Sequence, residues 1–282
     1  MGKFGNLIRR ELEASLDARK ADLEASELVA GLEKDRIDIS LPGWTLPLGH
    51  LHLVAQTQRE IEDIFIGMGY EIADGPEIET EYYNFEALNT PADHPARSLH
   101  DTFFVDDQVL LRTHTSPVQI RCMEKQRPPV HIIVPGTAYR RDSDATHTPM
   151  FHQVEGLVVD EHVTLADLKG TLETFARAMF GAERQVRLRP HFFPFTEPSV
   201  EVDVSCMFCE GAGCRLCKRS GWLEILGAGM VDPNVFGFVD DDPEIYSGFA
   251  FGMGIERIAM LKHGVNDLRL FFENDLRFLR QF

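Results

Sequence analysis

Two apolar runs near the middle of the chain predict a pair of antiparallel strands. The first run, 130–134, is rich in β-branched residues, and the second covers 150–159. Between them lies a polar loop, 140–149, with two arginines, two aspartates and a histidine. This pattern is typical of two strands joined by a long loop, and loops longer than a tight turn usually carry function.

The second strand and the loop carry residues that suit a binding pocket. Phe151, Gln153 and Glu155 are expected on one face, because side chains two apart in a strand point the same way. Arg140 offers a planar fork for phosphate or carboxylate, and His147 offers another donor. Glu155 and Gln153 would suit an ammonium group. A site for both phosphate and amine is what an amino-acid-activating enzyme needs, whereas the loop alone also fits a surface hairpin with solvated charges.

The N-terminal part of the chain alternates between helical and linker patterns. Residues 6–34 are rich in Leu, Ala, Glu, Lys and Arg, which predicts a solvated amphipathic helix. Proline and glycine mark a linker over 38–49. A regular apolar stripe then predicts a helix over 51–68, and a short strand is expected at 70–73.

The segments on either side of the first hairpin predict further elements. Alternation around two aspartates predicts a second hairpin over 101–112. Ser116 precedes a proline, and this pair suits the start of a helix that runs to about 125. Another apolar stripe predicts a scaffold helix over 165–179.

Four cysteines form two CxxC pairs separated by four residues. Four thiolates in two compact turns suit tetrahedral zinc with no open position for catalysis. Two nearby glycines supply the tight turns, and a reducing compartment disfavours two disulfides. Free thiols or a redox pair are the alternatives. The predicted structural zinc ligands are Cys206, Cys209, Cys214 and Cys217.

Composition and charge narrow the location and the partners. At 282 residues with 44% hydrophobic composition, the chain can bury one large core or two modest ones. It has no long uncharged apolar run, and its first residues lack the apolar region of a signal peptide, so a cytoplasmic protein is expected. A formal charge of −17 argues against this chain alone binding nucleic acid, so a partner is expected to carry much of any nucleic-acid binding.

Several motifs in order resemble one enzyme family. GTAYRRDSDATHTPMFHQVEG, at 136–156, resembles motif 2 of class II aminoacyl-tRNA synthetases, and YSGFAFGMGIERIAML, at 246–261, resembles motif 3. The helix, strand and proline over 51–76 resemble the weaker motif 1. In detail, the chain is similar to the α subunits of bacterial phenylalanyl-tRNA synthetases over about residues 40 to 282. Three further stretches agree: 94–121, 191–204 and 222–236.

The resemblance implies an α+β fold, the class II catalytic domain, in which helices flank an antiparallel sheet. This domain is expected over 41–282, with the zinc knuckle inserted at 205–221. The helix within 1–40 is expected to be the remnant of a longer helical arm that contacts tRNA in the family. Packing of this helix on the core or on a partner is the favoured alternative to tRNA contact.

For ATP, the resemblance implies phosphate clamps, a stacking ring and a Mg²⁺ ligand. Arg140 would hold the α-phosphate and the attacking carboxylate, and Arg257 with His147 would hold the outer phosphates. Phe151 would stack on adenine, and Asp142 would contact its edge. Arg257 is expected to be buried on an apolar helix, which favours a ligand role.

Two carboxylates are expected to act through Mg²⁺. Glu224 would bind Mg²⁺ or the ATP that carries it. Glu197 resembles a Mg²⁺ ligand shared with the partner subunit.

For the amino acid, the resemblance implies contacts from three parts of the chain. Gln153 and Glu155 would hold the α-amino group. Phe193 and Phe195 would present their edges to a substrate phenyl ring, although a bare pair of Phe also fits core packing. Ala250 would set the depth of the pocket. The remaining expected substrate contacts are His114, Ser116 and Gly252.

The implied activity is that of an α subunit in an (αβ)₂ heterotetramer. It would activate L-phenylalanine with ATP and transfer it to the terminal 2′-OH of tRNA(Phe), with the β subunit contributing tRNA recognition. Two other functions stay open at this point. One is a paralogue that adenylates an amino acid without charging tRNA, and the other is a non-catalytic amino-acid sensor. Retention of both arginines, Glu155 and Glu224 argues against a sensor, because sensing needs no phosphate clamp.

Overall fold

A computed structural model describes the chain except for residues 1, 45, 47, 99–100 and 145–146. The chain divides into two units, Met1–Gly49 and His50–Phe282. The first unit contains one helix among its described residues, α1 (Gly2–Lys34), whose leucines are exposed, as the prediction of a solvated helix requires. The predicted linker forms no helix or strand in its described part. No helix of the described chain combines the length and apolarity needed to cross a membrane.

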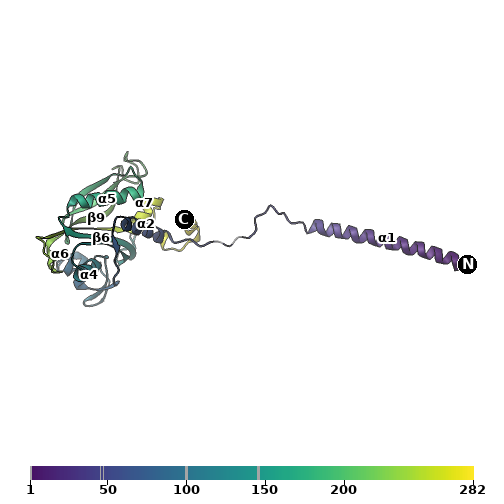
Figure 1. Cartoon of the computed structure of the whole chain (residues 1–282), viewed down its shortest axis with the longest axis horizontal. Coiled ribbons are helices and arrows are strands. Elements are labelled where there is room, and N and C mark those ends of the chain that lie inside the picture. Colours follow the sequence, from purple (N-terminus) through teal and green to yellow (C-terminus); the bar gives the residue numbers. More distant parts are fainter. Residues whose placement is uncertain (1, 45, 47, 99–100, 145–146) are drawn as a thin grey trace. The chain divides into compact units, whose positions relative to one another are not determined.

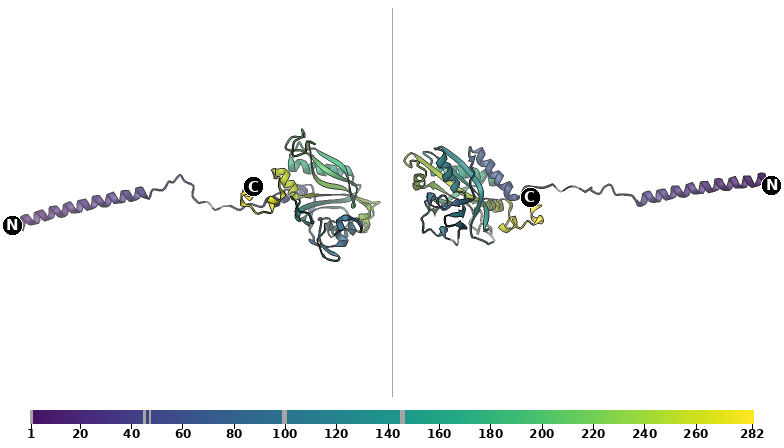
Figure 2. Two further views of the ribbon diagram at one scale, coloured as in Figure 1. Left: turned by 180° about the vertical axis from the view of Figure 1, so that it is seen from behind. Right: turned by 90° about the horizontal axis from the view of Figure 1, so that it is seen from below.

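A seven-stranded sheet forms the body of the second unit (Figures 1 and 2). Its order is β1-β5-β6-β10-β9-β8-β7, and every neighbouring pair is antiparallel except β1 with β5. The expected antiparallel sheet is therefore confirmed, with one short parallel strand at its edge. The strands are β1 (Glu71–Ile72), β5 (Val130–Tyr139), β6 (Met150–Glu161), β7 (Val186–Phe193), β8 (Thr196–Ser205), β9 (Trp222–Val231) and β10 (Tyr246–Gly254).

The two predicted hairpins are both present. β5 and β6 pair from Val130 opposite Val159 to Tyr139 opposite Met150, so β5 ends and β6 begins at the predicted loop. Positions 145 and 146 of that loop lie outside the described residues. The second hairpin forms two strands of a separate three-stranded sheet, ordered β2-β4-β3. These strands are β2 (Ile78–Thr80), β3 (Phe104–Asp106) and β4 (Val109–Leu111).

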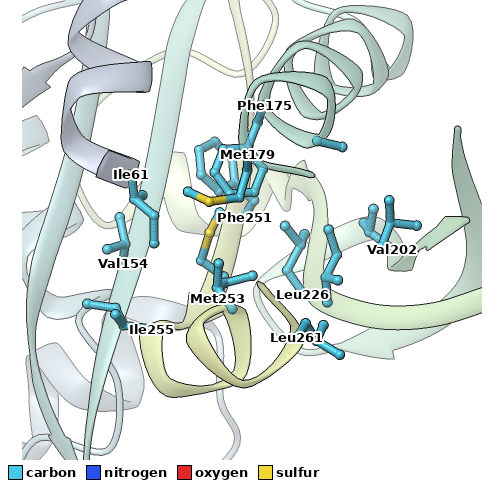
Figure 3. Packing of buried hydrophobic residues seen from close by; sticks show 14 of the residues in the cluster. Ile61, Val154, Phe175, Met179, Val202, Leu226, Phe251, Met253, Ile255 and Leu261 are labelled. Carbon is cyan, nitrogen blue, oxygen red and sulfur yellow. The ribbon is translucent and has the colours of Figure 1, made fainter. Parts of the chain in front are cut away.

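Three helices pack on one face of the large sheet, as Figure 1 shows. They are α2 (Leu53–Gly67), α5 (Leu165–Phe180) and α7 (Ile255–His263). A capping box starts α5. The Thr164 side chain accepts from the backbone N–H of Asp167, and the Asp167 side chain accepts from the backbone N–H of Thr164. In Figure 3, Phe175 and Ile61 from two of these helices lie around Phe251 of β10. Burial of this apolar face holds the helices on the sheet.

Shorter helices cover part of the opposite face. In β5, Ile133 packs beneath the three helices, whereas Ile132 and Val134 belong to a second cluster with Val118 of α4. The part of this face over β6, β10 and β9 is hollowed by a cavity. The remaining helices are α3 (Glu81–Asn84), α4 (Pro117–Lys125), α6 (Pro233–Gly237), α8 (Leu276–Leu279), η1 (Glu86–Leu88), η2 (Pro95–Arg97) and η3 (Leu268–Phe271).

Candidate active site

A cavity of about 900 Å³ lies on the sheet face opposite α2 and α5, and α7 contributes Arg257 and Met260 to its lining. Its walls come from the strands β6 to β10, from the start of α4, and from the loops between β5 and β6 and between β8 and β9. The structure thus brings together segments that are far apart in the sequence. The predicted site residues that line the cavity are His114, Ser116, Arg140, His147, Phe151, Gln153, Glu155, Phe193, Phe195, Cys217, Glu224, Ala250, Gly252 and Arg257.

Glu155 is buried at the base of the cavity and is surrounded by donors. The Ser116 hydroxyl donates to its Oε2 at 2.5 Å, and the Gln119 amide donates to the same oxygen at 2.8 Å. The backbone N–H of Thr115 donates to Oε1 at 3.2 Å. Burial raises the pKa of Glu155 to about 7, although these hydrogen bonds and the charge of Arg140 oppose the rise. The carboxyl group can therefore gain or lose a charge near neutral pH.

Among the side chains that line the cavity in the part of the chain that the structure describes, two polar atoms are buried without a hydrogen-bond partner. They are His114 Nδ1 and Gln153 Oε1. Burial, together with the charges of Arg140 and Arg112, lowers the pKa of His114 to about 3, so its imidazole is neutral. Buried polar atoms normally have partners, so these atoms are suited to binding a polar ligand.

An aromatic wall closes another side of the cavity. The rings of Phe193 and Phe195 lie 5.8 Å apart and nearly parallel, with 7° between their planes. The ring of His114 lies 6.2 Å from that of Phe195. Gly227 allows this arrangement, because a Cβ there would lie 2.8 Å from the Phe193 ring. Ala250 on β10 completes a pocket that suits an apolar side chain.

The guanidinium of Arg140 lies beside the ring of Phe151, the residue predicted to stack on adenine. Its Nε donates to the Thr113 carbonyl at 3.0 Å, and its Cζ lies 5.1 Å from the Phe151 ring centre. Desolvation lowers the pKa of Arg140, while the charges of Glu155 and Asp142 oppose this effect. A guanidinium stays protonated in proteins, so Arg140 supplies a positive charge to the cavity wall between Glu155 and Phe151.

Arg257 differs from its prediction. It stands on α7 but is exposed at the cavity wall instead of buried, because it lies on the side of the helix that turns away from the apolar core. Its Nη2 donates to the Glu224 carbonyl at 3.4 Å. His147 also lines the cavity, and its Nδ1 lies 2.9 Å from Asp144 Oδ2.

Glu224 is an exposed carboxylate held at the cavity wall by its neighbours on the sheet. Arg189 donates to Glu224 at 3.1 Å and to Asp203 at 2.8 Å. Asp203 also accepts from Arg187, at 3.0 Å. Carboxylates neutralise both arginines here, because Asp203 pairs with each of them and Arg189 also pairs with Glu201 and Glu224.

Two predicted ligand residues lie outside the cavity wall. Asp142 and Glu197 are exposed, and neither is among the residues that line it. Asp142 stands in the long loop, and Glu197 lies where a bulge interrupts the pairing of β8. Ser116 begins α4 as predicted, but its side chain does not cap the helix. Its hydroxyl makes no cap bond and donates to Glu155 instead.

Sequence reasoning missed two buried polar residues of the site. Gln119 donates a hydrogen bond to Glu155. The sequence feature that could have revealed it is a polar amide side chain among the buried apolar positions of α4. Arg112 is buried and donates to the Thr137 carbonyl at 2.7 Å, which braces β5 behind the cavity. Gly136 leaves room for this side chain, because a Cβ there would lie 2.2 Å from Arg112 Nη2.

The four cysteine sulfurs gather as their spacing predicts. All four lie within 4.8 Å of one another, with Cys206–Cys214 at 3.9 Å and Cys209–Cys217 at 3.8 Å. Sulfurs at about 2.3 Å from a tetrahedral zinc would be about 3.8 Å apart, so the donor set fits this ion. The Cys214 amide donates to Cys217 Sγ at 3.0 Å, and such bonds lower the pKa of this thiol to about 6. Gly211 has a φ of +85° in the intervening turn.

Comparison with known proteins agrees with this architecture. The family model described as tRNA synthetases class II core domain (F) matches residues 36–282. A solved structure of pyrrolysyl-tRNA synthetase from Desulfitobacterium hafniense is similar with a TM-score of 0.60 and 17% identity. The match covers 80% of this chain and 75% of that one, and it supports the fold alone.

Curated relatives are much more similar in sequence. A phenylalanine–tRNA ligase alpha subunit from Geobacter sulfurreducens is 61% identical over 282 residues, which cover 100% of this chain and 83% of that relative. One from Heliobacterium modesticaldum is 60% identical over 284 residues and is covered to 84%. This chain therefore belongs to the class II tRNA synthetases and, within them, to the phenylalanine–tRNA ligase alpha subunits.

Proposed function

We propose that this chain activates L-phenylalanine with ATP and, as the α subunit of a phenylalanine–tRNA ligase, transfers it to tRNA(Phe). The observation that carries this proposal is the single cavity in which Glu155, Arg140 and the Phe193–Phe195 wall meet. A carboxylate, a guanidinium and an aromatic wall match the ammonium, the reacting carboxylate–phosphate pair and the phenyl ring.

In the first step, the phenylalanine carboxylate attacks the α-phosphate of ATP, and pyrophosphate leaves. Glu155 and Gln153 hold the α-ammonium group, and Arg140 neutralises the negative charge that grows between the carboxylate and the phosphate. No side chain needs to form a covalent intermediate, so catalysis rests on positioning and charge neutralisation. Phe151 stacks on adenine, and Arg257 with His147 holds the outer phosphates.

Mg²⁺ bound with ATP would neutralise phosphate charge. Glu224 fits this ion, because it presents an exposed oxygen donor at the cavity wall. Glu197 and Asp142 lie outside the wall, so their proposed contacts need a partner subunit or a bound nucleotide that reaches them. The four cysteines would hold a structural zinc with no ligand position left for substrate.

In the second step, the terminal 2′-OH of tRNA(Phe) attacks the adenylate carbonyl, and AMP leaves. The formal charge of −17 disfavours tRNA binding by this chain alone, so a β subunit in an (αβ)₂ assembly would supply most contacts.

Charging of tRNA(Phe) tests this proposal. The chain and a β subunit are mixed with phenylalanine, ATP and tRNA ending in adenosine, 2′-deoxyadenosine or 3′-deoxyadenosine. We expect charging of the normal and 3′-deoxy ends only. Charging of the 2′-deoxy end would contradict the assigned hydroxyl, and the absence of any charging would contradict the proposed function.

A further inference from the structure

The four-cysteine knuckle forms one wall of the active-site cavity. Leu216, Cys217, Lys218 and Ser220 line the cavity on this side, together with Trp222 at the start of β9. Cys217 is therefore both a metal-ligand candidate and a wall residue. This links the metal cluster to the nucleotide half of the site, because Glu224 follows Trp222 on the same strand.

The backbone around the cysteines holds Lys218 in a defined position. Its φ is +52°, and its N–H donates to the Arg215 carbonyl at 3.2 Å. The next residue, Arg219, has a φ of +66° and donates to the Cys214 carbonyl at 2.8 Å. Two consecutive left-handed residues are unfavourable outside a constrained turn, so the cysteine cluster is what keeps this conformation.

The charges on this wall differ in how they are neutralised. Arg187 and Arg189 are both paired with the buried Asp203, and Arg187 also stacks 4.6 Å from the Trp222 ring. Lys218 is exposed, and among the described residues no carboxylate lies within ion-pair distance of it. Lys218 is thus a cation on the cavity wall that protein carboxylates leave available for an anionic ligand.

We propose that Lys218 binds the outer phosphates of ATP and of pyrophosphate, and that metal in the knuckle holds it in place. This inference rests on the proposed function, which puts ATP in the cavity. A lysine is a mobile point charge, so it suits a polyphosphate whose position changes as pyrophosphate leaves. The knuckle would then set nucleotide affinity, in addition to stabilising its own loop.

Binding to the reconstituted α–β complex tests the inference by calorimetry with ATP, pyrophosphate and adenosine. Lys218→Gln should weaken ATP and pyrophosphate by about fivefold, the upper range for an exposed ion pair, and leave adenosine unchanged. Arg219→Gln is the matched control, since Arg219 has the same charge in the same turn but does not line the cavity. Equal effects of the two variants, or a loss confined to tRNA binding, would overturn the inference.

Metal removal tests the second half. A chelator should remove zinc, measured by elemental analysis, and weaken ATP binding in the wild type by the same factor. The stripped Lys218→Gln protein should show no further loss, because both changes remove one contact. Unchanged ATP affinity in the stripped wild type, with adenosine binding intact, would refute the role of the metal. Phenylalanine-dependent exchange between ATP and labelled pyrophosphate is measured on the same wild-type protein. A failure of the proposed function is thereby distinguished from a failure of this inference.

Discussion

The Ser116 hydroxyl lies 2.5 Å from Glu155 Oε2, and this bond joins the start of α4 to the middle of β6. It holds a buried carboxylate at the wall of the cavity, where we propose that the substrate ammonium group binds. Burial holds the pKa of Glu155 at about 7, so this carboxyl group is poised between a neutral and a charged form. Several expected outcomes depend on this balance.

Phenylalanine affinity should rise as pH increases from about 6 to about 8. Only the ionised form of Glu155 attracts the ammonium group, and that form becomes dominant above its pKa of about 7. Calorimetric titration across this range measures the effect. In Glu155→Gln the dependence should disappear, and affinity should fall by roughly 30-fold, since a charged hydrogen bond is worth about 2 kcal/mol. A variant that keeps the wild-type pH profile would contradict the role of Glu155.

Stability of the fold should show the opposite trend. A carboxyl whose pKa is raised in the folded state favours folding while it is protonated and loses this advantage as pH rises from about 4.5 to about 7. Glu155→Gln should therefore be more stable than the wild type at about pH 8, by at most about 3 kcal/mol. Urea unfolding at two pH values measures this. Exposed Glu183→Gln is the control and should change neither curve; a destabilised Glu155→Gln at high pH would count against the raised pKa.

Gly252→Ala should raise KM for phenylalanine by about tenfold and leave KM for ATP unchanged. A Cβ at this position would lie 3.0 Å from Gln153 Nε2 and 3.1 Å from Glu155 Cγ, so it would displace the ammonium-binding groups by a few tenths of an ångström. Steady-state kinetics separates the two constants. Gly170→Ala on α5 meets no atom within 4 Å and should stabilise its helix by about 0.5–1 kcal/mol without a kinetic effect. Equal kinetics in both variants would argue against the assigned amine site.

The purified chain should contain one zinc ion, and Cys209→Ser should reduce this content and lower Tm. Loss of one of four thiolates leaves an incomplete tetrahedral site. Elemental analysis and calorimetry measure the two effects. Cys122→Ser is the control, because this half-buried cysteine lies outside the cluster. Full zinc content in Cys209→Ser, or loss of zinc in Cys122→Ser, would contradict the assignment.

Local patterns predicted the elements that carry the site. Two apolar runs on either side of a charged loop predicted the β5–β6 hairpin. Alternation along the second run predicted the face of β6 that lines the cavity. The cysteine cluster followed from spacing, because two CxxC pairs are a common arrangement of zinc ligands. Both features depend on neighbours in the chain.

Features set by distant segments were not accessible in this way. Gln119 reaches Glu155 only because α4 packs on the sheet, and Arg112 braces β5 from the position that follows β4. The exposure of Arg257 depends on which side of α7 meets the sheet. Lys218 lines the cavity only because the four-cysteine knuckle folds beside it. Sequence periodicity contains no information about these encounters.

The most direct test of the central claim is phenylalanine-dependent exchange between ATP and labelled pyrophosphate by the chain with its β subunit. The account predicts exchange with phenylalanine, none with tyrosine or without amino acid, and a loss of at least about 100-fold in Arg140→Gln, which removes a charge made for the transition state. Absence of exchange with phenylalanine in a folded, zinc-containing wild type would contradict it.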